Sequence, residues 1–518
     1  MERERWGSKL GVILAVAGSA VGLGNFLRFP AIAAGNGGGA FMIPYFVCFF
    51  LLGLPLMWIE WTIGRFGGGF EHSTAPGIFQ TMWRKNRFIK YFGVIGIFAP
   101  TVIFIYYTYI ESWLLGYSFF AITGKYFTCT DQADMQAFLK GYQGLTVNEH
   151  FSSIGPAYLF FLITFSLNIL VICVGLRRGI ERVCKWGLMV LFVLAIIIVV
   201  RVLTLGVPDP NRPDWSPMAG LGFLWNPRWD KLTEAKIWLA AAGQIFFSLS
   251  AGFGVILTYA SYLTKQDDVT LSGLTASTTN EIAEVILGGS IIIPAAFAFI
   301  GPQAAQDIGG KDIFDLGFIT MPLIFEKIVG GQYFAFMWFF LLFLAGLTSS
   351  ISLALPAIAF LEDEFNLSRR EATTIFGVIT FILIQPVIFF YGNGVLGEMD
   401  FWGTSVCLVV FAAVESILFG WVFGMDRAWT EMHEGANLRI PGFYRWIIKY
   451  ITPLALITII GLWFWQEWKN KMMMLDVNPA DKPFLFLTRI GLAGLFIFLL
   501  LMVWIVWRRR SQSAEGHI

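Results

Sequence analysis

Long apolar stretches dominate this chain of 518 residues, of which 57% are hydrophobic and only 14% are charged. A soluble domain is closer to a quarter charged, and a helix that crosses a lipid bilayer needs about 20 apolar residues. The sequence therefore predicts an all-α polytopic membrane protein, with no cleavable signal peptide before the first span. Charged interruptions divide the stretches into twelve predicted transmembrane helices: residues 9–35, 39–67, 88–121, 156–174, 181–204, 235–264, 270–300, 331–361, 370–390, 400–424, 446–467 and 483–507.

Basic residues gather in alternate connections between these spans. Arg3, Arg5 and Lys9 lie at the start of the chain, and Arg508–Arg510 follow the last span. Further basic residues lie at 84–90, between the second and third spans, and at 177–185, between the fourth and fifth. Cytoplasmic loops carry an excess of Lys and Arg, so both termini are predicted to be cytoplasmic, in the inner (plasma) membrane of the cell. The connections at 122–155, 205–234 and 301–330 are then extracellular, and we expect short helices in them.

Composition and residue placement disfavour several other kinds of protein. The net charge of +1 argues against a nucleic-acid partner. The four histidines fall in loops or the tail, which argues against a metal or acid–base site built on histidine. The cysteines form no CxxC pair and are interpreted as small apolar residues rather than as disulfides or metal ligands. They are Cys48, Cys129, Cys173, Cys184 and Cys407.

Two spans contain glycine and small polar residues: "AGSAVGLGNFLRFP" (17–30) and "GQIFFSLSAGFG" (243–254). Glycine weakens a helix by about 1 kcal/mol relative to alanine, and an arginine at membrane depth is usually functional. The two stretches lie in the first and sixth spans, so each opens a five-helix half of opposite membrane orientation. Glycine-interrupted spans at matching positions predict an inverted-repeat transporter with a midplane site. Close helix packing through small residues is the alternative for each stretch taken alone.

This symmetry predicts a single membrane transporter domain over residues 1–518. Its parts are a first five-helix repeat at 9–204, a second, inverted repeat at 235–424 and two further helices at 446–507.

Ten sequence motifs, in order along the chain, now point to a family. They are "GLGNFLRFP", "GGGAFMIPY", "LMWIEW", "IYYTYIESW", "GQIFFSLS", "TYASY", "NEIAEVILGGS", "AGLTSSI", "AFLEDE" and "EMDFW". In these the chain resembles the neurotransmitter:sodium symporters, above all their bacterial leucine-transporter branch. The resemblance implies a LeuT-like fold of twelve transmembrane helices, a 5+5 inverted repeat with helices 1 and 6 broken. It also implies a sodium-coupled symporter that works by alternating access and is not an enzyme.

The resemblance further implies two sodium ions as co-transported ligands. Sodium prefers oxygen ligands, which unwound backbone and half-helix ends supply inside a membrane. The first sodium site would consist of Ala20, Asn25, Ser248 and Asn280. The second would consist of Gly18, Val21, Ala345, Thr348 and Ser349. For Thr348 and Ser349 the alternative is a hydrogen bond back to a carbonyl of their own helix.

The substrate would lie between the two breaks. Backbone amides of Leu23 and Gly24 begin a half-helix whose positive end suits a carboxylate, and Tyr107 adds a phenolic donor. An α-ammonium group would be held by the carbonyls of Ala20, Phe247 and Ser248 and by the hydroxyl of Ser250. By resemblance the side-chain pocket is lined by Ile103, Phe247, Phe253, Ser349 and Leu353. Plain helix packing is the alternative for Ile103 and Leu353.

Gly22 and Ser19 bear on the choice of substrate. Gly22 stands where monoamine-transporting relatives have an aspartate that pairs with the amine. Without that carboxylate the substrate must bring its own, which favours amino acids over monoamines. The predicted pocket lining offers no charged partner, which favours neutral, mainly apolar side chains. Ser19 stands where the bacterial leucine transporter has asparagine, so the exact amino acid stays open.

Glu284 is a carboxylate inside the seventh span, on the same helix face as Asn280. Chloride-dependent relatives have serine at the matching position, so a fixed carboxylate predicts chloride independence and leaves proton antiport on the return step open. A hydrogen-bonded structural glutamate is the alternative. The other intramembrane carboxylates, Glu60, Glu111 and Glu415, are interpreted as groups that tether helices.

Two gates follow from the resemblance. Arg28 and Asp400 would form an extracellular ion pair above the site. The intracellular gate would consist of Arg3, Trp6, Ser261, Tyr262 and Asp363. Exposed ion pairs contribute only about 0–1 kcal/mol, which suits contacts that must open and close.

Other functions remain as alternatives to sodium symport. An ion channel would need a continuous polar pore, and an intramembrane enzyme would need paired nucleophilic or acid–base groups within the spans. A proton-coupled carrier is the nearest rival. The expected partners are a small neutral amino acid, sodium ions and the lipid bilayer, and a homodimer is left open.

Overall fold

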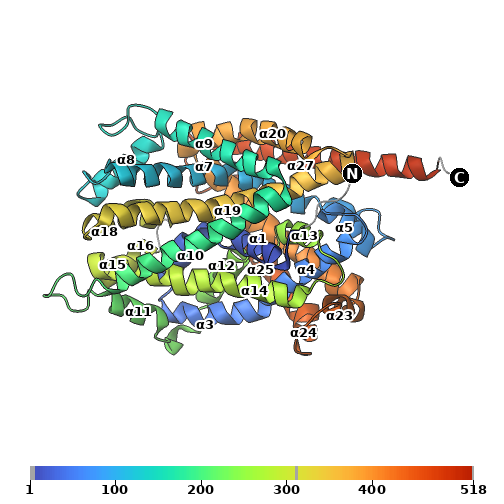
Figure 1. Ribbon diagram of the computed structural model, residues 1–518, viewed down its shortest axis with the longest axis horizontal. Coiled ribbons are helices and arrows are strands. Elements are labelled where there is room, and N and C mark those ends of the chain that lie inside the picture. Colours follow the sequence, from blue (N-terminus) through green and yellow to red (C-terminus); the bar gives the residue numbers. More distant parts are fainter. Residues whose placement is uncertain (1–5, 310–312, 516–518) are drawn as a thin grey trace.

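The structure is a computed structural model that describes residues 6–309 and 313–515, and within these ranges it contains helices but no β-strand. Most of the long helices run side by side along the longest axis of the molecule (Figure 1). Ten of the predicted spans are continuous helices that are long and apolar enough to cross a membrane. They are Gly39–Gly68, Ile89–Thr123, Gly155–Val174, Leu176–Leu203, Val269–Ile300, Gly331–Phe365, Arg369–Phe389, Val395–Val422, Tyr444–Gln466 and Lys482–Arg510.

The first span is broken, as predicted. Helix α1 (Lys9–Ala20) ends three residues before a π-helical turn, η1 (Gly24–Arg28), which continues into α2 (Phe29–Gly35). The two halves are bent by 48°. Ser8 caps the start of α1, because its hydroxyl accepts a hydrogen bond of 2.9 Å from the backbone N–H of Gly11.

The sixth span is broken more widely. Helix α12 (Ala235–Ser248) and helix α13 (Val255–Ala260) are separated by six non-helical residues, 249–254. Within this segment Ser250, Gly252 and Gly254 have φ angles of +53°, +86° and +73°. Glycine adopts such left-handed conformations without the steric cost that a Cβ atom brings. The glycines that the sequence analysis singled out therefore permit the chain to leave the helix here.

Burial separates the central helices from the peripheral ones. In the most apolar stretch of Ile89–Thr123, 83% of the residues are buried, and the share is the same in that of Val269–Ile300. The first of these spans ends with α7 (Ile95–Thr123). In the most apolar stretch of α27 (Lys482–Glu515) the share is 22%. Apolar side chains that remain exposed on outer helices are expected of a protein whose solvent is lipid. The third and seventh spans are therefore central, and the last span is peripheral.

Short helices lie in the connections, as predicted for the three long loops. One end of the bundle carries α8 (Gln132–Tyr142), α11 (Pro217–Trp225), α16 (Pro302–Gly309) and α18 (Met321–Glu326). The other end carries α5 (Ala75–Met82) and α23 (Met425–His433), and α24 (Tyr444–Trp446) begins the eleventh span there, as Figure 1 shows.

A π-helical segment of the seventh span faces the first break. The seventh span consists of α14 (Val269–Glu281), the π-helical segment η5 (Ile282–Gly288) and α15 (Gly289–Ile300). Segments η1 and η5 pack against each other. The approach is so close that a Cβ atom on Gly288 would collide with the carbonyl oxygen of Asn25.

Candidate functional site

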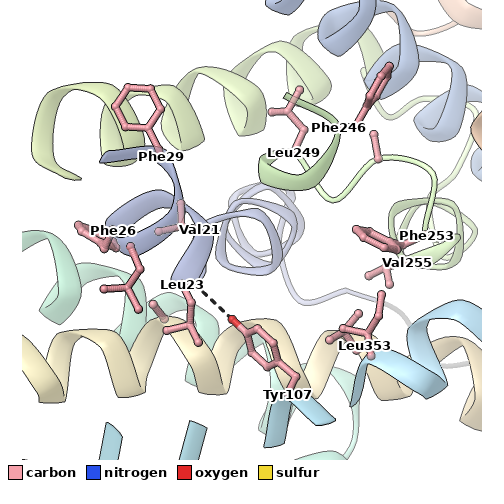
Figure 2. Packing of buried hydrophobic residues seen from close by; sticks show 14 of the residues in the cluster. Val21, Leu23, Phe26, Phe29, Tyr107, Phe246, Leu249, Phe253, Val255 and Leu353 are labelled. Carbon is pink, nitrogen blue, oxygen red and sulfur yellow. Dashed lines mark hydrogen bonds between the residues drawn. The ribbon is translucent and has the colours of Figure 1, made fainter. Parts of the chain in front are cut away.

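The two helix breaks face a cavity of about 340 Å³. Figure 2 shows Leu23 from the first break and Phe253 from the second, with Tyr107 of α7 and Leu353 of α19 (Gly331–Phe365) nearby. The structure brings every predicted substrate residue to the wall of this cavity, although their roles in binding stay predictions. These residues are Ser19, Ala20, Gly22, Leu23, Gly24, Ile103, Tyr107, Phe247, Ser248, Ser250, Phe253, Ser349 and Leu353.

Tyr107 is hydrogen-bonded to the first break. The backbone N–H of Leu23 donates to the Tyr107 hydroxyl oxygen at 3.3 Å (Figure 2). Because the phenol oxygen accepts this bond, its own proton can be donated to another acceptor in the cavity. The arrangement places a side-chain donor beside the backbone amides that begin the half-helix.

Gly22 lies directly against two hydroxyl groups. A Cβ atom at this position would be 2.8 Å from the Ser349 Oγ and 3.1 Å from the Tyr107 Oη. At Gly24 a Cβ atom would be 2.8 Å from the ring of Phe247. A side chain at Gly22 would therefore require these hydroxyl groups to shift, and with glycine no acidic group stands at this point of the wall.

The carbonyl oxygen of Ser19 connects three elements. It accepts hydrogen bonds from the hydroxyl of Ser250 at 3.2 Å and from that of Ser349 at 3.1 Å. The Ser19 hydroxyl lies 2.7 Å from the hydroxyl of Ser352 on α19. One residue at the end of α1 is therefore joined both to the break in the sixth span and to α19.

The side chains predicted for the first sodium site form one buried network. The Asn25 amide donates to the Asn280 side-chain oxygen at 2.8 Å, and the Asn280 amide donates to the Ser248 hydroxyl at 2.7 Å. The Asn25 side-chain oxygen accepts from the backbone N–H of Gly22, also at 2.8 Å. Ala20 lies at the wall of the adjacent cavity. The structure thus brings together neutral oxygens from the first, sixth and seventh spans.

Glu284 belongs to the same network and is fully buried. Its carboxylate accepts from the Gln244 amide at 2.7 Å, from the Asn25 amide at 3.1 Å and from the hydroxyl of Ser248. Gln244 was not among the predicted residues. The Asn280 amide also donates to it, at 3.5 Å, so a carboxylate is in direct contact with three of the predicted sodium ligands.

The second predicted sodium site is partly assembled. Gly18 faces α19, because a Cβ atom there would lie 3.5 Å from the Cβ of Thr348. The Thr348 hydroxyl donates to the carbonyls of Leu344 and Ala345, each at 3.1 Å. This is the bond to its own helix that was kept as an alternative, and a hydroxyl that donates its proton in this way still has lone pairs for an ion. Val21, the C-cap of α1, is buried beside the break.

The two residues predicted for the extracellular gate lie at the same cavity without a direct ion pair. Arg28 and Asp400 both line the cavity, but no ion pair of 4.0 Å or less joins them in the described part of the chain. The Arg28 guanidinium lies 4.1 Å from the ring centroid of Phe247, and Asp400 accepts a hydrogen bond of 2.6 Å from the Tyr106 hydroxyl. The two charged groups still interact electrostatically through space, and their role as a gate stays a prediction.

The predicted intracellular gate is described in part, since Arg3 lies outside the described residues. The Trp6 indole donates to the carbonyl of Tyr259 at 3.1 Å. Ser261 and Tyr262 follow directly after α13, and the Ser261 hydroxyl donates to Thr258 at 2.7 Å. Asp363, near the end of α19, accepts from the backbone N–H of Ser73 at 2.9 Å.

The other predicted tethering carboxylates are all fully buried. Glu60 accepts a hydrogen bond from the backbone N–H of Gly252, which ties the second span to the break in the sixth. Glu111 accepts from the Asn168 amide at 3.1 and 3.2 Å, and Ser350 donates to that Asn168 at 2.6 Å. Glu415 interacts with Glu60.

Sequence reasoning missed some residues of the cavity wall. Tyr106 bridges to the tenth span, because its hydroxyl also lies 2.8 Å from that of Thr404. Adjacent side chains on a helix point about 100° apart, so placing Tyr107 at the cavity gave no reason to place Tyr106 there as well. A signal was nevertheless present, since Thr404 lies one helical turn after the predicted gate residue Asp400. The missed residues are Leu27, Tyr106, Ile110, Phe314, Leu396, Gly397 and Thr404.

Two broken helices that face one cavity in the middle of a helical membrane bundle define a secondary transporter. The sequence profile described as the "Sodium:neurotransmitter symporter family" matches residues 3–480. The chain belongs to this family of sodium-coupled transporters and is therefore not an enzyme.

Individual relatives agree with this assignment. The chain is 30% identical to a sodium-dependent transporter of Bacillus subtilis, with 88% of this chain and 96% of the relative covered. It is 29% identical to a sodium-dependent transporter of Methanocaldococcus jannaschii, with 89% of this chain and 90% of the relative covered. It is 26% identical to the sodium- and chloride-dependent glycine transporter 2 of Xenopus laevis, with 96% of this chain and 70% of the relative covered. The crystal structure of MhsT in complex with L-phenylalanine matches with a TM-score of 0.74 at 30% identity and covers 88% of this chain and 99% of MhsT. This match confirms the predicted LeuT-like fold.

Proposed function

We propose that this transporter imports neutral, mainly apolar amino acids together with sodium, by alternating access and without chloride. The observation that carries the proposal is the wall of the central cavity. Among the described lining residues only Arg28 and Asp400 are charged, and with glycine at position 22 no acidic side chain stands beside the first break. A substrate that binds there has to supply its own carboxylate. The phenylalanine bound to MhsT and the substrate of glycine transporter 2 support the amino-acid class.

In the proposed binding mode the substrate spans the two breaks. Its carboxylate accepts from the backbone amides of Leu23 and Gly24 and from the Tyr107 hydroxyl, at the positive end of the half-helix. Its ammonium group donates to the carbonyls of Ala20, Phe247 and Ser248 and to the Ser250 hydroxyl. Its side chain lies among Ile103, Phe253 and Leu353, which line the cavity with apolar surface. Apolar walls favour an uncharged substrate side chain, because burying an unpaired charge is costly.

Two sodium ions are proposed as co-transported ligands. The first would lie among Ala20, Asn25, Ser248 and Asn280, where ion–oxygen contacts replace some of the present amide–oxygen contacts. The second would lie between the end of α1 and α19, with Thr348 and Ser349 as hydroxyl ligands. Two charges that move inward across 100 mV gain about 4–5 kcal/mol. At 1.36 kcal/mol per tenfold ratio this suffices for roughly thousandfold accumulation of a zwitterion.

Glu284 supports the proposal of chloride independence. Its carboxylate contacts Asn25 and Ser248, so it supplies negative charge beside the first proposed ion without a mobile anion. We expect uptake by the wild type to be the same in chloride and in gluconate. Replacement of Glu284 by serine should make uptake depend on chloride, and equal uptake by this variant in both anions would contradict the assigned role.

Alternating access assigns roles to the larger parts of the chain. We propose that the repeats at 9–204 and 235–424 surround the site and expose it to the two sides of a plasma membrane in turn, with both termini in the cytoplasm. Arg28 and Asp400 would meet when the extracellular side closes. A second set of residues would meet when the intracellular side closes: Arg3, Trp6, Ser261, Tyr262 and Asp363.

Uptake into proteoliposomes tests the proposal as a whole. Purified protein is reconstituted, and a panel of radiolabelled amino acids and monoamines is offered with an inward gradient of sodium or of protons. We expect accumulation of apolar amino acids that requires the sodium gradient. Accumulation driven by protons in the absence of sodium would identify the rival carrier, and preference for a monoamine would contradict the argument from Gly22.

A further inference from the structure

A groove with basic and aromatic walls lies at one end of the bundle, away from the central cavity. It occupies about 1060 Å³ between the end of the tenth span, helix α23 and the start of the eleventh span. We call it the basic groove and define it by Trp421, Asp426, Arg427, Arg445, Trp446 and Lys449. Gly424 and Gly442 also line it, and a Cβ atom on either would meet nothing within 4 Å. Because glycine has no side chain, the groove stays open at these two positions.

The charge of the basic groove is unbalanced. Its wall carries three cations, Arg427, Arg445 and Lys449, and one carboxylate, Asp426, so its net charge is 3 − 1 = +2. Asp426 forms an ion pair with Arg445. Within the described ranges no ion pair involves Arg427 or Lys449. Two cations therefore remain available for an anionic ligand.

The side chains around these cations are arranged to hold them in place. The Arg427 guanidinium lies 4.3 Å from the ring centroid of Phe423, and the Lys449 ammonium lies 5.2 Å from that of Tyr450. The Trp421 indole donates to the carbonyl of Lys449 at 2.6 Å, which joins the tenth span to the eleventh. Stacking on an aromatic face leaves the N–H groups at the edge of a guanidinium free to donate.

The aromatic rim of the groove is exposed. Trp421 and Trp446 are 45% and 68% exposed, and along α25 (Thr452–Gln466) Leu454 and Ile457 are 51% and 42% exposed. Exposed Trp beside an exposed apolar helix is typical of the level at which a protein leaves the hydrocarbon of a bilayer and enters the headgroups. An apolar path therefore runs from the cationic groove along the outside of the eleventh span.

We propose that the basic groove binds the phosphate headgroup of an anionic phospholipid, whose acyl chains lie along α25. A free phosphate would satisfy Arg427 and Lys449, but it would make no use of the apolar path beside them. Figure 1 places α23 and α24 at the same end of the bundle as α5, which precedes the basic loop at 84–90. In the proposed orientation this is the cytoplasmic leaflet, where basic residues meet anionic lipid.

Native mass spectrometry of the purified, full-length transporter tests this site. Phosphatidylglycerol and phosphatidylcholine are titrated separately onto the wild type and onto the Arg427→Gln/Lys449→Gln variant. A basic residue near an anionic lipid surface contributes roughly a factor of five in affinity, so the double variant should bind phosphatidylglycerol about 25-fold more weakly. Its binding of phosphatidylcholine should not change. The matched control is Lys85→Gln/Arg87→Gln, which removes two exposed cations at the same end and should leave both affinities at the wild-type values.

Competition distinguishes lipid from a soluble anion. Inorganic phosphate at millimolar concentration should not displace phosphatidylglycerol from the wild type. Displacement by phosphate at millimolar or lower concentration would show a site for a free anion and would overturn the proposal, as would equal loss of phosphatidylglycerol in the control variant. A symmetrical gel-filtration peak checks that the double variant is folded. If it is not, Lys449→Gln alone should weaken phosphatidylglycerol binding about fivefold, and an unchanged affinity would overturn the proposal.

Discussion

At the scale of single residues, Gly22 carries more information about the substrate than any charged residue of the cavity wall. The sequence suggests that a carboxylate is missing there, and the structure adds that the neighbouring hydroxyls occupy the space where a side chain would begin. The absence of an acid at Gly22 is thus matched by packing around it. A substrate amine would have to be held by carbonyl dipoles instead of a full charge.

Replacement of Gly22 by alanine tests this close packing. The added Cβ atom would lie 2.8 Å from the Ser349 Oγ, and such overpacking costs about 1–3 kcal/mol. We expect the affinity for the amino-acid substrate to fall about tenfold or more in an equilibrium binding assay. The control is Gly243→Ala on α12, where the new Cβ meets nothing within 4 Å. Equal affinities of the two variants would contradict the prediction.

Asn25 and Asn280 are predicted to act through sodium rather than through the substrate directly. Removal of either amide breaks the hydrogen bond between the two side chains and removes one oxygen from the proposed ion site. In Asn25→Ala and Asn280→Ala we expect the sodium concentration that gives half-maximal substrate binding to rise about tenfold. Thr278→Ala, on the exposed face of the same helix as Asn280, should leave it unchanged. A normal sodium requirement in both asparagine variants would exclude them as ligands.

At the scale of elements, each break depends on groups from other helices. The non-helical segment of the sixth span has backbone N–H groups that no helix satisfies, and the carboxylate of Glu60 accepts one of them, from Gly252. The first break is held through the Ser19 carbonyl, which accepts from Ser250 and Ser349. The unwound shape is therefore a property of several spans together, because buried backbone polar groups require partners.

Glu60 offers a test of this dependence. In Glu60→Ala the N–H of Gly252 loses its buried acceptor, which costs about 1–3 kcal/mol of unfolding free energy. We expect the thermal midpoint of the purified protein to fall by several degrees and uptake to fall with it. Glu60→Gln keeps an acceptor oxygen and should retain most of the stability. If Glu60→Ala were as stable as the wild type, the carboxylate would not be what holds the segment.

At the scale of the whole molecule, the order and length of the spans could be predicted from the sequence alone. Apolar runs bounded by charges give each helix to within a few residues, since a bilayer sets both the length and the composition. The breaks were also predictable, because glycines and small polar residues at matching positions have few other uses in a spanning helix. Asn280 and Ser349, recognised through family motifs, both contact the first break, and their roles stay predictions.

Contacts between distant side chains could not be predicted in the same way. Arg28 and Asp400 were expected to pair, but their separation depends on how far the first and tenth spans stand apart, and no local pattern encodes that distance. Tyr106 was missed because its partners Asp400 and Thr404 are almost 300 residues away in sequence. The basic groove depends likewise on the packing of α23 against the start of the eleventh span.

The proposed orientation can be checked by labelling. In a background without the five native cysteines, single cysteines replace Val147, which is 78% exposed in the loop 122–155, or Phe443, which is 58% exposed before the eleventh span. A membrane-impermeant maleimide should label Val147→Cys in intact cells. It should label Phe443→Cys only in inside-out vesicles. The reverse pattern would place both termini outside and would move the basic groove to the other leaflet.

The π-helical segment η5 has a consequence for how chains of this family differ in length. A π turn holds one residue more than an α turn, so losing one residue there leaves the two flanking helices in the same axial register. Such a loss would rotate Glu284 relative to Asn280 while the loops at both ends stay unchanged. Single-residue gaps between relatives should therefore fall inside transmembrane helices as well as in loops. Where one falls at η5, we expect it to accompany a change in the use of anions.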